Sequence, residues 1–284
     1  MCRVIIFIIT MKKTVSKYLK KLNKYFFRSV LFFICIILII YTLFYFNQNK
    51  KEIYFKIGNG FFGGQFFKNQ LISSASLYNV DMASKFFKLS KDVSNNKKEK
   101  DLQWVNYQLS RTEFIKGNLY NAVIYADKEI ELYPDNCRTY YIRGLAYGYL
   151  EDLDNAIKDF EKFNGVCVKN SWAGHNDLAW FWFRKGNMEK VVSVISEVKD
   201  IYPENPWLMN TYGTALMNQK KYGEAIKYLE IAKISSGKMS EKDWGAAYPG
   251  NNPKVYAEGL SAMRQNIDDN ITLANNLIKK SISK

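Results

Sequence analysis

The amino-acid sequence predicts an all-α protein in which an N-terminal transmembrane helix is followed by a solenoid of helix–turn–helix repeats and a C-terminal capping helix. Three observations predict this fold class: one uncharged apolar run, a repeat of about 34 residues, and long stretches whose apolar residues recur three and four positions apart. Hydrophobic residues make up 48% of the 284-residue chain and aromatic residues 16%, which is the composition of a folded protein rather than a disordered one.

The positive charge of the chain is concentrated at its N-terminus. Residues 1–28 contain eight Lys or Arg residues and no Asp or Glu, so they supply +8 of the formal net charge of +14. The other +6 is spread over residues 47–284, which is too thin for the basic surface that a nucleic-acid-binding domain needs. We therefore expect residues 1–28 to be a basic cytoplasmic segment, and we expect no nucleic-acid partner.

Residues 29–46, SVLFFICIILIIYTLFYF, are eighteen consecutive residues without a charge. A helix of this length reaches roughly 27 Å at 1.5 Å per residue, close to the ~30 Å hydrocarbon core of a bilayer. Because the run is apolar on every side, a buried core helix with a polar stripe fits it less well. The sequence predicts a single membrane-spanning helix at 29–46.

A cleaved signal peptide is the main alternative to an uncleaved anchor, because a basic segment precedes the apolar run. Cleavage requires small residues at the end of that run, whereas the chain reads YTLFYFNQ there. We therefore predict a single-pass anchor in the cell membrane. Since the basic flank lies before the span, the positive-inside rule places the N-terminus in the cytoplasm and the repeat domain outside it.

The segments that follow the span are expected to lead into the repeats. Residues 47–63 contain several glycines and are predicted to be a flexible juxtamembrane linker. Residues 64–100 are predicted to hold a degenerate helical pair, which starts the array, and then a solvated linker that ends in SNNKKEK.

A six-residue phrase reveals the repeat: ELYPDN at 131–136 recurs as DIYPEN at 200–205, 69 residues later. Proline ends a helix because it lacks the N–H that a helix interior needs. Four helical segments around these copies align without gaps on one small residue, at intervals of 34, 35 and 34: Ala122, Ala156, Val191 and Ala225. Another helical segment precedes each of them. Residues 101–237 are therefore predicted to hold four helix–turn–helix repeats.

This pattern resembles the tetratricopeptide repeat family. The resemblance rests on a bulky residue early in the first helix, a glycine one turn later, a further bulky residue, a small and a bulky residue in the second helix, and a closing proline. In that order they are Tyr140; Gly144 and Gly213; Tyr147, Trp182 and Leu216; Ala122, Ala156 and Ala225; Phe160, Ile195 and Leu229; and Pro134 and Pro203. The sequence departs from the pattern at Val191, at Ser110 and Ala179, and in lacking proline after the second and fourth repeats. The resemblance implies a right-handed α-solenoid.

The C-terminal part of the chain follows the repeats. Residues 238–253 are predicted to be a loop. Residues 254–284 are predicted to form one capping helix, or two helices that are separated between Asn266 and Asn270. Such a cap covers the apolar face that a repeat array exposes at its end.

The residue inventory argues against an enzyme. The chain has one histidine, His175, and no GxxxxGK[ST], HExxH or CxxC motif. It therefore has almost none of the residues that a metal cluster or a histidine-based triad requires. We expect no catalytic residue, no metal and no cofactor.

Two cysteines lie at the same end of one predicted hairpin. Cys137 begins the first helix of the second repeat and Cys167 follows its second helix, with a sequence separation of 30. Outside the reducing cytosol, a disulfide between them would stabilise the fold by roughly 3 kcal/mol. Two separate thiols are the alternative, and the sequence leaves both open.

On the family resemblance, the first helices line the concave side of the superhelix, and one of their faces points into a groove. Aromatic residues mixed with Asn and Arg on that face suit an extended peptide. By helical spacing the face consists of Trp104, Tyr107, Arg111, Phe114, Arg138, Tyr141, Tyr149, Asn176, Trp180, Phe183, Arg184, Trp207 and Asn210. The alternative is that many of these rings simply pack between repeats.

Two functions are compatible with these features. The first is a membrane-anchored scaffold or adaptor that binds a protein or peptide partner through the groove, in envelope, secretion or complex assembly. The second is a regulatory or substrate-recruiting subunit of an enzyme complex, with the chemistry in another chain. The sequence predicts neither the partner nor the oligomeric state.

Overall fold

The computed structural model of the protein describes residues 30–62, 78–97, 100–247 and 252–282, and the secondary structure within these ranges is helical, with no strand. The chain divides into two compact parts, residues 1–53 and residues 54–284. The prediction for the basic segment 1–28 falls outside the described residues.

The first part contains the apolar helix Val30–Gln48, which is long and apolar enough to cross a membrane. None of its most apolar window is buried against other parts of the protein. The predicted span at 29–46 therefore corresponds to a helix whose apolar side chains are exposed. A lipid environment would remove this apolar surface from water.

The predicted flexible linker at 47–63 is wrong, because α2 (Lys50–Phe61) is a helix. The glycines do not break this helix, and Gly58 is a packing position within it. The Phe87 ring fills the space beside Gly58, so that an added Cβ there would lie 2.6 Å from the ring. α2 pairs with α3 (Val80–Lys97) through aromatic contacts, including Phe55 against Phe87 at 5.7 Å between ring centroids. The helical pair that begins the array thus starts earlier than the predicted 64–100, of which residues 63–77 and 98–99 lie outside the described residues.

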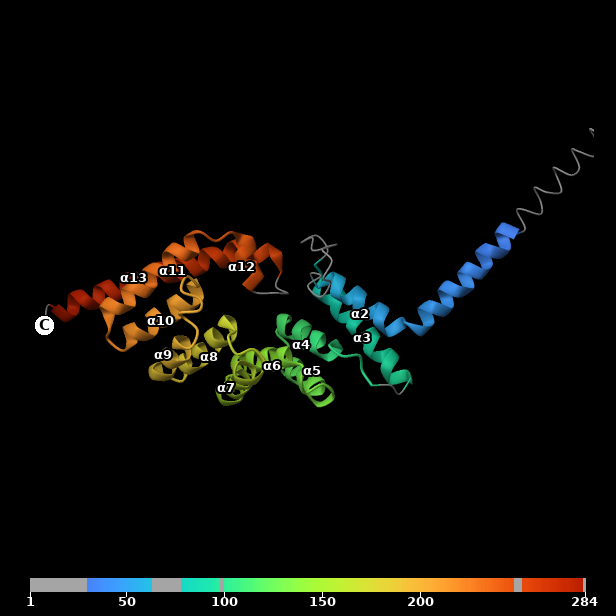
Figure 1. The fold of residues 1–284 in the computed structure, drawn as a ribbon, viewed down its shortest axis with the longest axis horizontal. Coiled ribbons are helices and arrows are strands. Elements are labelled where there is room, and N and C mark those ends of the chain that lie inside the picture. Colours follow the sequence, from blue (N-terminus) through green and yellow to red (C-terminus); the bar gives the residue numbers. More distant parts are fainter. Residues whose placement is uncertain (1–29, 63–77, 98–99, 248–251, 283–284) are drawn as a thin grey trace, which may run out of the picture. The chain divides into compact units, whose positions relative to one another are not determined.

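Four helical hairpins follow, as the sequence predicts. They are α4 (Val105–Ile115) with α5 (Leu119–Leu132), α6 (Cys137–Tyr149) with α7 (Leu153–Lys162), α8 (Trp172–Arg184) with α9 (Met188–Ser196), and α10 (Pro206–Asn218) with α11 (Tyr222–Gly237) (Figure 1). We call these hairpins repeats 1 to 4. The four aligned residues of the second helices, Ala122, Ala156, Val191 and Ala225, are all fully buried. The alignment of the four repeats predicted from the sequence therefore matches the positions at which their second helices are buried.

The tight turn inside each hairpin uses a residue with positive φ at the same repeat position. These residues are Gly117, Glu151, Gly186 and Lys220, with φ of 78°, 66°, 76° and 64°. A left-handed residue after the last helical turn lets the chain reverse, and glycine adopts it without a steric penalty. Repeats 2 and 4 place a side chain at this position and so carry backbone strain that repeats 1 and 3 avoid.

Repeat 2 ends in a local irregularity. After α7 the chain forms one turn of π-helix, Phe163–Cys167. Cys167 is joined there to Cys137 at the start of α6, with the two Cα atoms 5.5 Å apart. The disulfide links the two open ends of one hairpin.

The C-terminal region differs from the prediction in two respects. The predicted loop at 238–253 contains a short helix, α12 (Glu241–Ala247), whose start is capped by Ser240. After a 3-10 turn at Pro253–Val255, α13 (Tyr256–Ile282) runs for 27 residues without the break that the sequence allowed between Asn266 and Asn270. α13 packs on α11 as the predicted cap: Ile267 and Ala274 are fully buried in the core that runs through repeats 2 to 4.

Candidate functional site

Twelve of the thirteen predicted groove residues lie on the first helices and Trp104 directly precedes one of them, but the chain itself covers both ends of their common face. In repeat 1, Tyr107 and Arg111 are only 7% and 8% exposed. The segment at the end of α2 covers Arg111, whose guanidinium lies 4.5 Å from the centroid of the Phe62 ring directly after that helix. Beside this contact, Gln108 Nε2 donates a hydrogen bond to Asn59 Oδ1 at 2.6 Å. Burial lowers the pKa of Arg111.

Trp104 belongs to the same covered end. It precedes α4 with a left-handed φ of 78°. Its backbone N–H donates to Glu129 Oε1 at 2.7 Å, and its ring lies edge-on to Tyr107 at 5.5 Å. These contacts hold the start of repeat 1 rather than present a binding surface.

The far end of the face is covered by the capping helix. Asn210 in α10 donates to Asn266 Oδ1 at 3.2 Å and accepts from Asn270 Nδ2 at 3.0 Å, and both of these partners belong to α13. Trp207, at the start of α10, stacks on Trp172 of α8 with ring centroids 5.0 Å apart. Asn210 therefore has a structural role in holding the cap, and its binding role stays a prediction.

In the middle of the face, two predicted residues bridge neighbouring repeats. The Tyr141 hydroxyl of α6 donates a short hydrogen bond to Asp177 Oδ2 of α8. The next residue toward the N-terminus, Asn176, accepts from the Thr211 hydroxyl of α10 at 2.8 Å. Burial raises the pKa of Asp177 to about 6, while the hydrogen bonds from Tyr141 and Asn176 act in the opposite direction. Sequence reasoning missed Asp177, although a carboxylate in an otherwise nearly uncharged helix was the available signal.

Between the covered ends lies a contiguous row of side chains from three successive first helices, which we call the aromatic strip: the exposed Tyr149 and Trp180 and the partly buried Phe114 and Arg184. The Phe114 and Tyr149 rings lie edge to face at 5.5 Å, and the Tyr149 and Trp180 rings are 6.2 Å apart. Tyr149 is 58% exposed and Trp180 is 39% exposed. The Arg184 guanidinium lies 4.9 Å from the Trp180 ring.

The charge of Arg184 is satisfied within the protein. Its guanidinium donates to the Gly148 carbonyl at 3.0 Å and forms a close ion pair with Glu151, the left-handed residue of the repeat 2 turn. Sequence reasoning also missed Glu151, because a turn residue gives no periodic signal. Of the other predicted residues, Arg138 is exposed and Phe183 is partly buried against the main core.

The described residues offer little for catalysis. His175 is buried, with Nδ1 at 2.8 Å from the Ser171 carbonyl oxygen and Nε2 at 3.4 Å from Glu197 Oε2. Within the described ranges, no group of three or more His, Cys, Asp or Glu side chains could hold a metal ion. The arrangement is that of a packed scaffold with one exposed strip.

Residues 138–165, which cover α6, α7 and the turn of π-helix after them, match the family model described as "Tetratricopeptide repeat". This match falls on repeat 2 in the register that the other three hairpins share. The chain contains a tetratricopeptide repeat. The predicted resemblance to this family and the predicted all-α repeat fold are confirmed.

Related proteins agree with this assignment. The mitochondrial import receptor subunit TOM70 of Saccharomyces cerevisiae is 27% identical over 157 residues, which are 55% of this chain. The matched stretch is only 24% of TOM70, so this chain spans about a quarter of the curated relative. Two MamA crystal structures share the tetratricopeptide fold. One matches with a TM-score of 0.52 at 18% identity, covering 67% of this chain and 94% of that chain, and MamA AMB-1 matches with 0.51 at 13% identity, covering 68% and 95%.

Proposed function

We propose that this tetratricopeptide-repeat protein is a membrane-anchored scaffold that binds a protein or peptide partner through the aromatic strip. The observation that carries the proposal is the exposure of Tyr149 and Trp180, at 58% and 39%, on neighbouring first helices. Tyr, Trp and Arg are the side chains that most often dominate binding energy at protein interfaces. The similar yeast protein is a mitochondrial import receptor subunit, and a receptor role fits the same kind of surface.

The covered ends of the first-helix face support the choice of the strip over the wider predicted groove. α2 and α3 occupy the face of repeat 1, and α13 engages Asn210 at repeat 4. A partner can therefore reach repeats 2 and 3 without displacing part of this chain. Displacing α2 would expose the buried guanidinium contacts and amide hydrogen bonds of repeat 1, and each buried polar group left without a partner costs about 1–3 kcal/mol.

The anchor and its orientation belong to the same proposal. The helix Val30–Gln48 is long and apolar enough to span a bilayer, and the basic residues before it favour a cytoplasmic N-terminus. The repeats then lie outside the cytoplasm, where the Cys137–Cys167 disulfide would persist. Thiol labelling of intact and permeabilised cells under reducing conditions tests the orientation: labelling of the reduced pair only after permeabilisation would contradict it.

Crosslinking in intact cells tests the binding role. Partners captured by the full-length protein are compared with those captured by Tyr149→Ala and by Tyr120→Ala. Tyr120 is the matched control, since it is a 75% exposed tyrosine in the second helix of repeat 1. We expect Tyr149→Ala to lose the main partner and Tyr120→Ala to keep it. Equal capture by all three proteins would contradict the assignment of the strip.

A further inference from the structure

We infer that the aromatic strip receives a proline-rich segment of the partner, held in the polyproline II conformation. This inference rests on the proposed function and names the chemistry of its ligand. Polyproline II segments dock on surfaces lined by aromatic rings, because the flat rings pack against prolines and because the segment is already extended and loses little entropy on binding. The strip offers such rings in a row from α4, α6 and α8.

The charge balance of the strip favours an uncharged ligand. Arg184 is its one charged member, and this charge is already paired with Glu151 and bonded to the Gly148 carbonyl. An acidic segment would have to compete with Glu151 for the guanidinium. A basic segment would meet no acidic side chain in the strip itself. A segment rich in proline needs neither kind of charge.

The hydrogen-bonding groups of the strip match the backbone of such a segment. Polyproline II has no internal hydrogen bonds, so its carbonyl oxygens need donors. The Tyr149 hydroxyl and the Trp180 indole N–H have no hydrogen-bond acceptor among the described residues, and both side chains are exposed. These two donors belong to the rings of the strip itself, so they are available to the carbonyls of a bound segment.

The dimensions limit the length of the bound segment. Ring centroids are 5.5 Å apart between Phe114 and Tyr149 and 6.2 Å apart between Tyr149 and Trp180. At 3.1 Å per residue, polyproline II covers this row with about four residues. The covered face of repeat 1 on one side and the α13 contacts of repeat 4 on the other leave the strip as the accessible part. A short proline-rich motif therefore fits better than a long one.

Fluorescence anisotropy with labelled octapeptides tests the inference on the full-length protein in detergent micelles. Three peptides are titrated up to about 1 mM, the weak end of specific binding: an octaproline, a Gly-Ser octapeptide of the same length, and an acidic Glu-Ser octapeptide. We expect saturable binding of the octaproline, and at least about tenfold weaker binding of the other two.

Substitutions in the strip then locate the site. Trp180→Ala and Tyr149→Ala are each expected to weaken octaproline binding by about tenfold or more, the size of effect seen at aromatic anchors. Tyr120→Ala, outside the strip, is expected to leave it unchanged. Because Trp180 also packs on Phe181 at 5.0 Å, the more exposed Tyr149 provides the variant that should leave the fold intact, which circular dichroism verifies.

The outcomes separate the inference from the proposed function. Octaproline binding that neither strip substitution weakens overturns the inference. So does an acidic or Gly-Ser peptide that binds more tightly than octaproline and depends on Tyr149, although this result leaves the proposed function standing. If no peptide binds in a strip-dependent way and partner capture in cells is also insensitive to Tyr149→Ala, both are overturned.

Discussion

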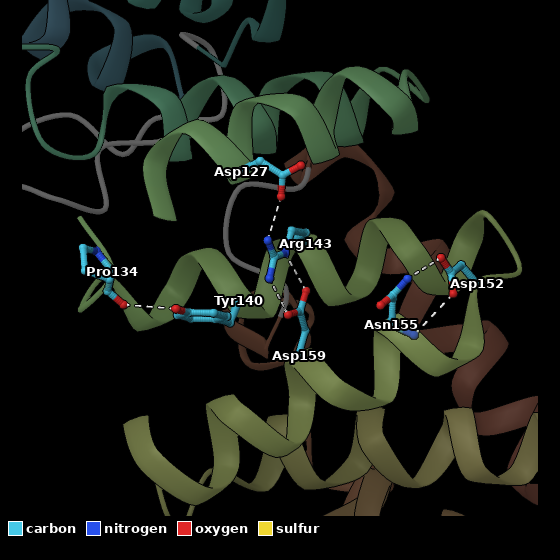
Figure 2. Close-up of polar contacts among 7 residues, drawn as sticks. All are labelled: Asp127, Pro134, Tyr140, Arg143, Asp152, Asn155 and Asp159. Atoms are coloured by element: carbon cyan, nitrogen blue, oxygen red, sulfur yellow. Dashed lines mark hydrogen bonds and ion pairs between the residues drawn. The ribbon is translucent and has the colours of Figure 1, made fainter. Parts of the chain in front are cut away.

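Arg143 forms a buried ion pair at a position where the other repeats are apolar. Its guanidinium donates to both carboxylate oxygens of Asp159, at 2.8 and 2.7 Å, and to Asp127 of the preceding repeat at 2.7 Å (Figure 2). The side chains of Arg143 and Asp159 are 19% and 5% exposed, whereas that of Asp127 is 51% exposed. Burial raises the pKa of Asp159 against the opposing effect of Arg143.

In the repeat register, Arg143 aligns with Leu178 and Tyr212, and Asp159 aligns with Val194 and Tyr228. Those apolar residues belong to the main core or pack directly against it, and Tyr212 and Tyr228 meet edge to face at 4.7 Å. Removing one partner of a buried ion pair typically costs 3–5 kcal/mol, whereas replacing both by apolar residues is often neutral or stabilising by about 1–4 kcal/mol. We therefore expect Arg143→Leu to destabilise the array by about 3–5 kcal/mol.

The assay is urea unfolding of the full-length protein in detergent micelles, followed by circular dichroism. The double variant Arg143→Leu with Asp159→Val should recover most of the stability that the single variant loses. Lys185→Ala is the control, because it removes an exposed ion pair with Asp154 and a contact of the ammonium with the Trp182 ring at 5.7 Å and should cost less than about 1 kcal/mol. A single variant within 1 kcal/mol of the parent, or a double variant as unstable as the single one, would refute the reasoning.

Three further predictions concern single contacts. The pKa of Asp177 is raised from 3.8 to about 6, so the folded state binds the proton more tightly than the unfolded state does. The free energy of unfolding should therefore fall by up to roughly 3 kcal/mol as the pH rises from about 4 to above 6, at about 1.4 kcal/mol per pKa unit. The unfolding midpoint of Asp177→Asn should lack this pH dependence. Reducing the Cys137–Cys167 disulfide should cost roughly 3 kcal/mol; an unchanged urea midpoint in dithiothreitol would contradict this. Lys220→Gly replaces a non-glycine residue that has a positive φ. This variant should relieve about 1 kcal/mol of backbone strain and so raise the melting temperature. A lower melting temperature would contradict this prediction.

The repeat fold was predictable from the sequence because it depends on local periodicity. The equivalent positions Ala122, Ala156, Val191 and Ala225, three of which hold the small residue alanine, mark where two helices pack, and the structure buries all four. The helix α2 was not predictable in the same way. Its glycines read as a linker, and only the ring of Phe87, which lies far along the chain, makes Gly58 a packing position.

The candidate site was predicted only in part, for a physical reason. Helical spacing shows which residues share a face, but not what covers it. Arg111 and Asn210 lie on the predicted face, but Arg111 contacts Phe62, directly after α2, and Asn210 bonds to α13. Both are contacts between segments far apart in the sequence. Tyr149 and Trp180 were predicted and are exposed. The sequence therefore predicted the face, whereas its accessible part required the tertiary structure.

Site-specific photocrosslinking tests the central claim most directly, namely that the aromatic strip binds a partner. A photoreactive amino acid is placed at Tyr149 in the strip, at Tyr120 outside it, and at Asn210 under the cap, each in the full-length protein in its own membrane. The account predicts a discrete crosslinked partner from position 149 and none from positions 120 and 210. The same partner from position 120, or no protein from position 149, would contradict it.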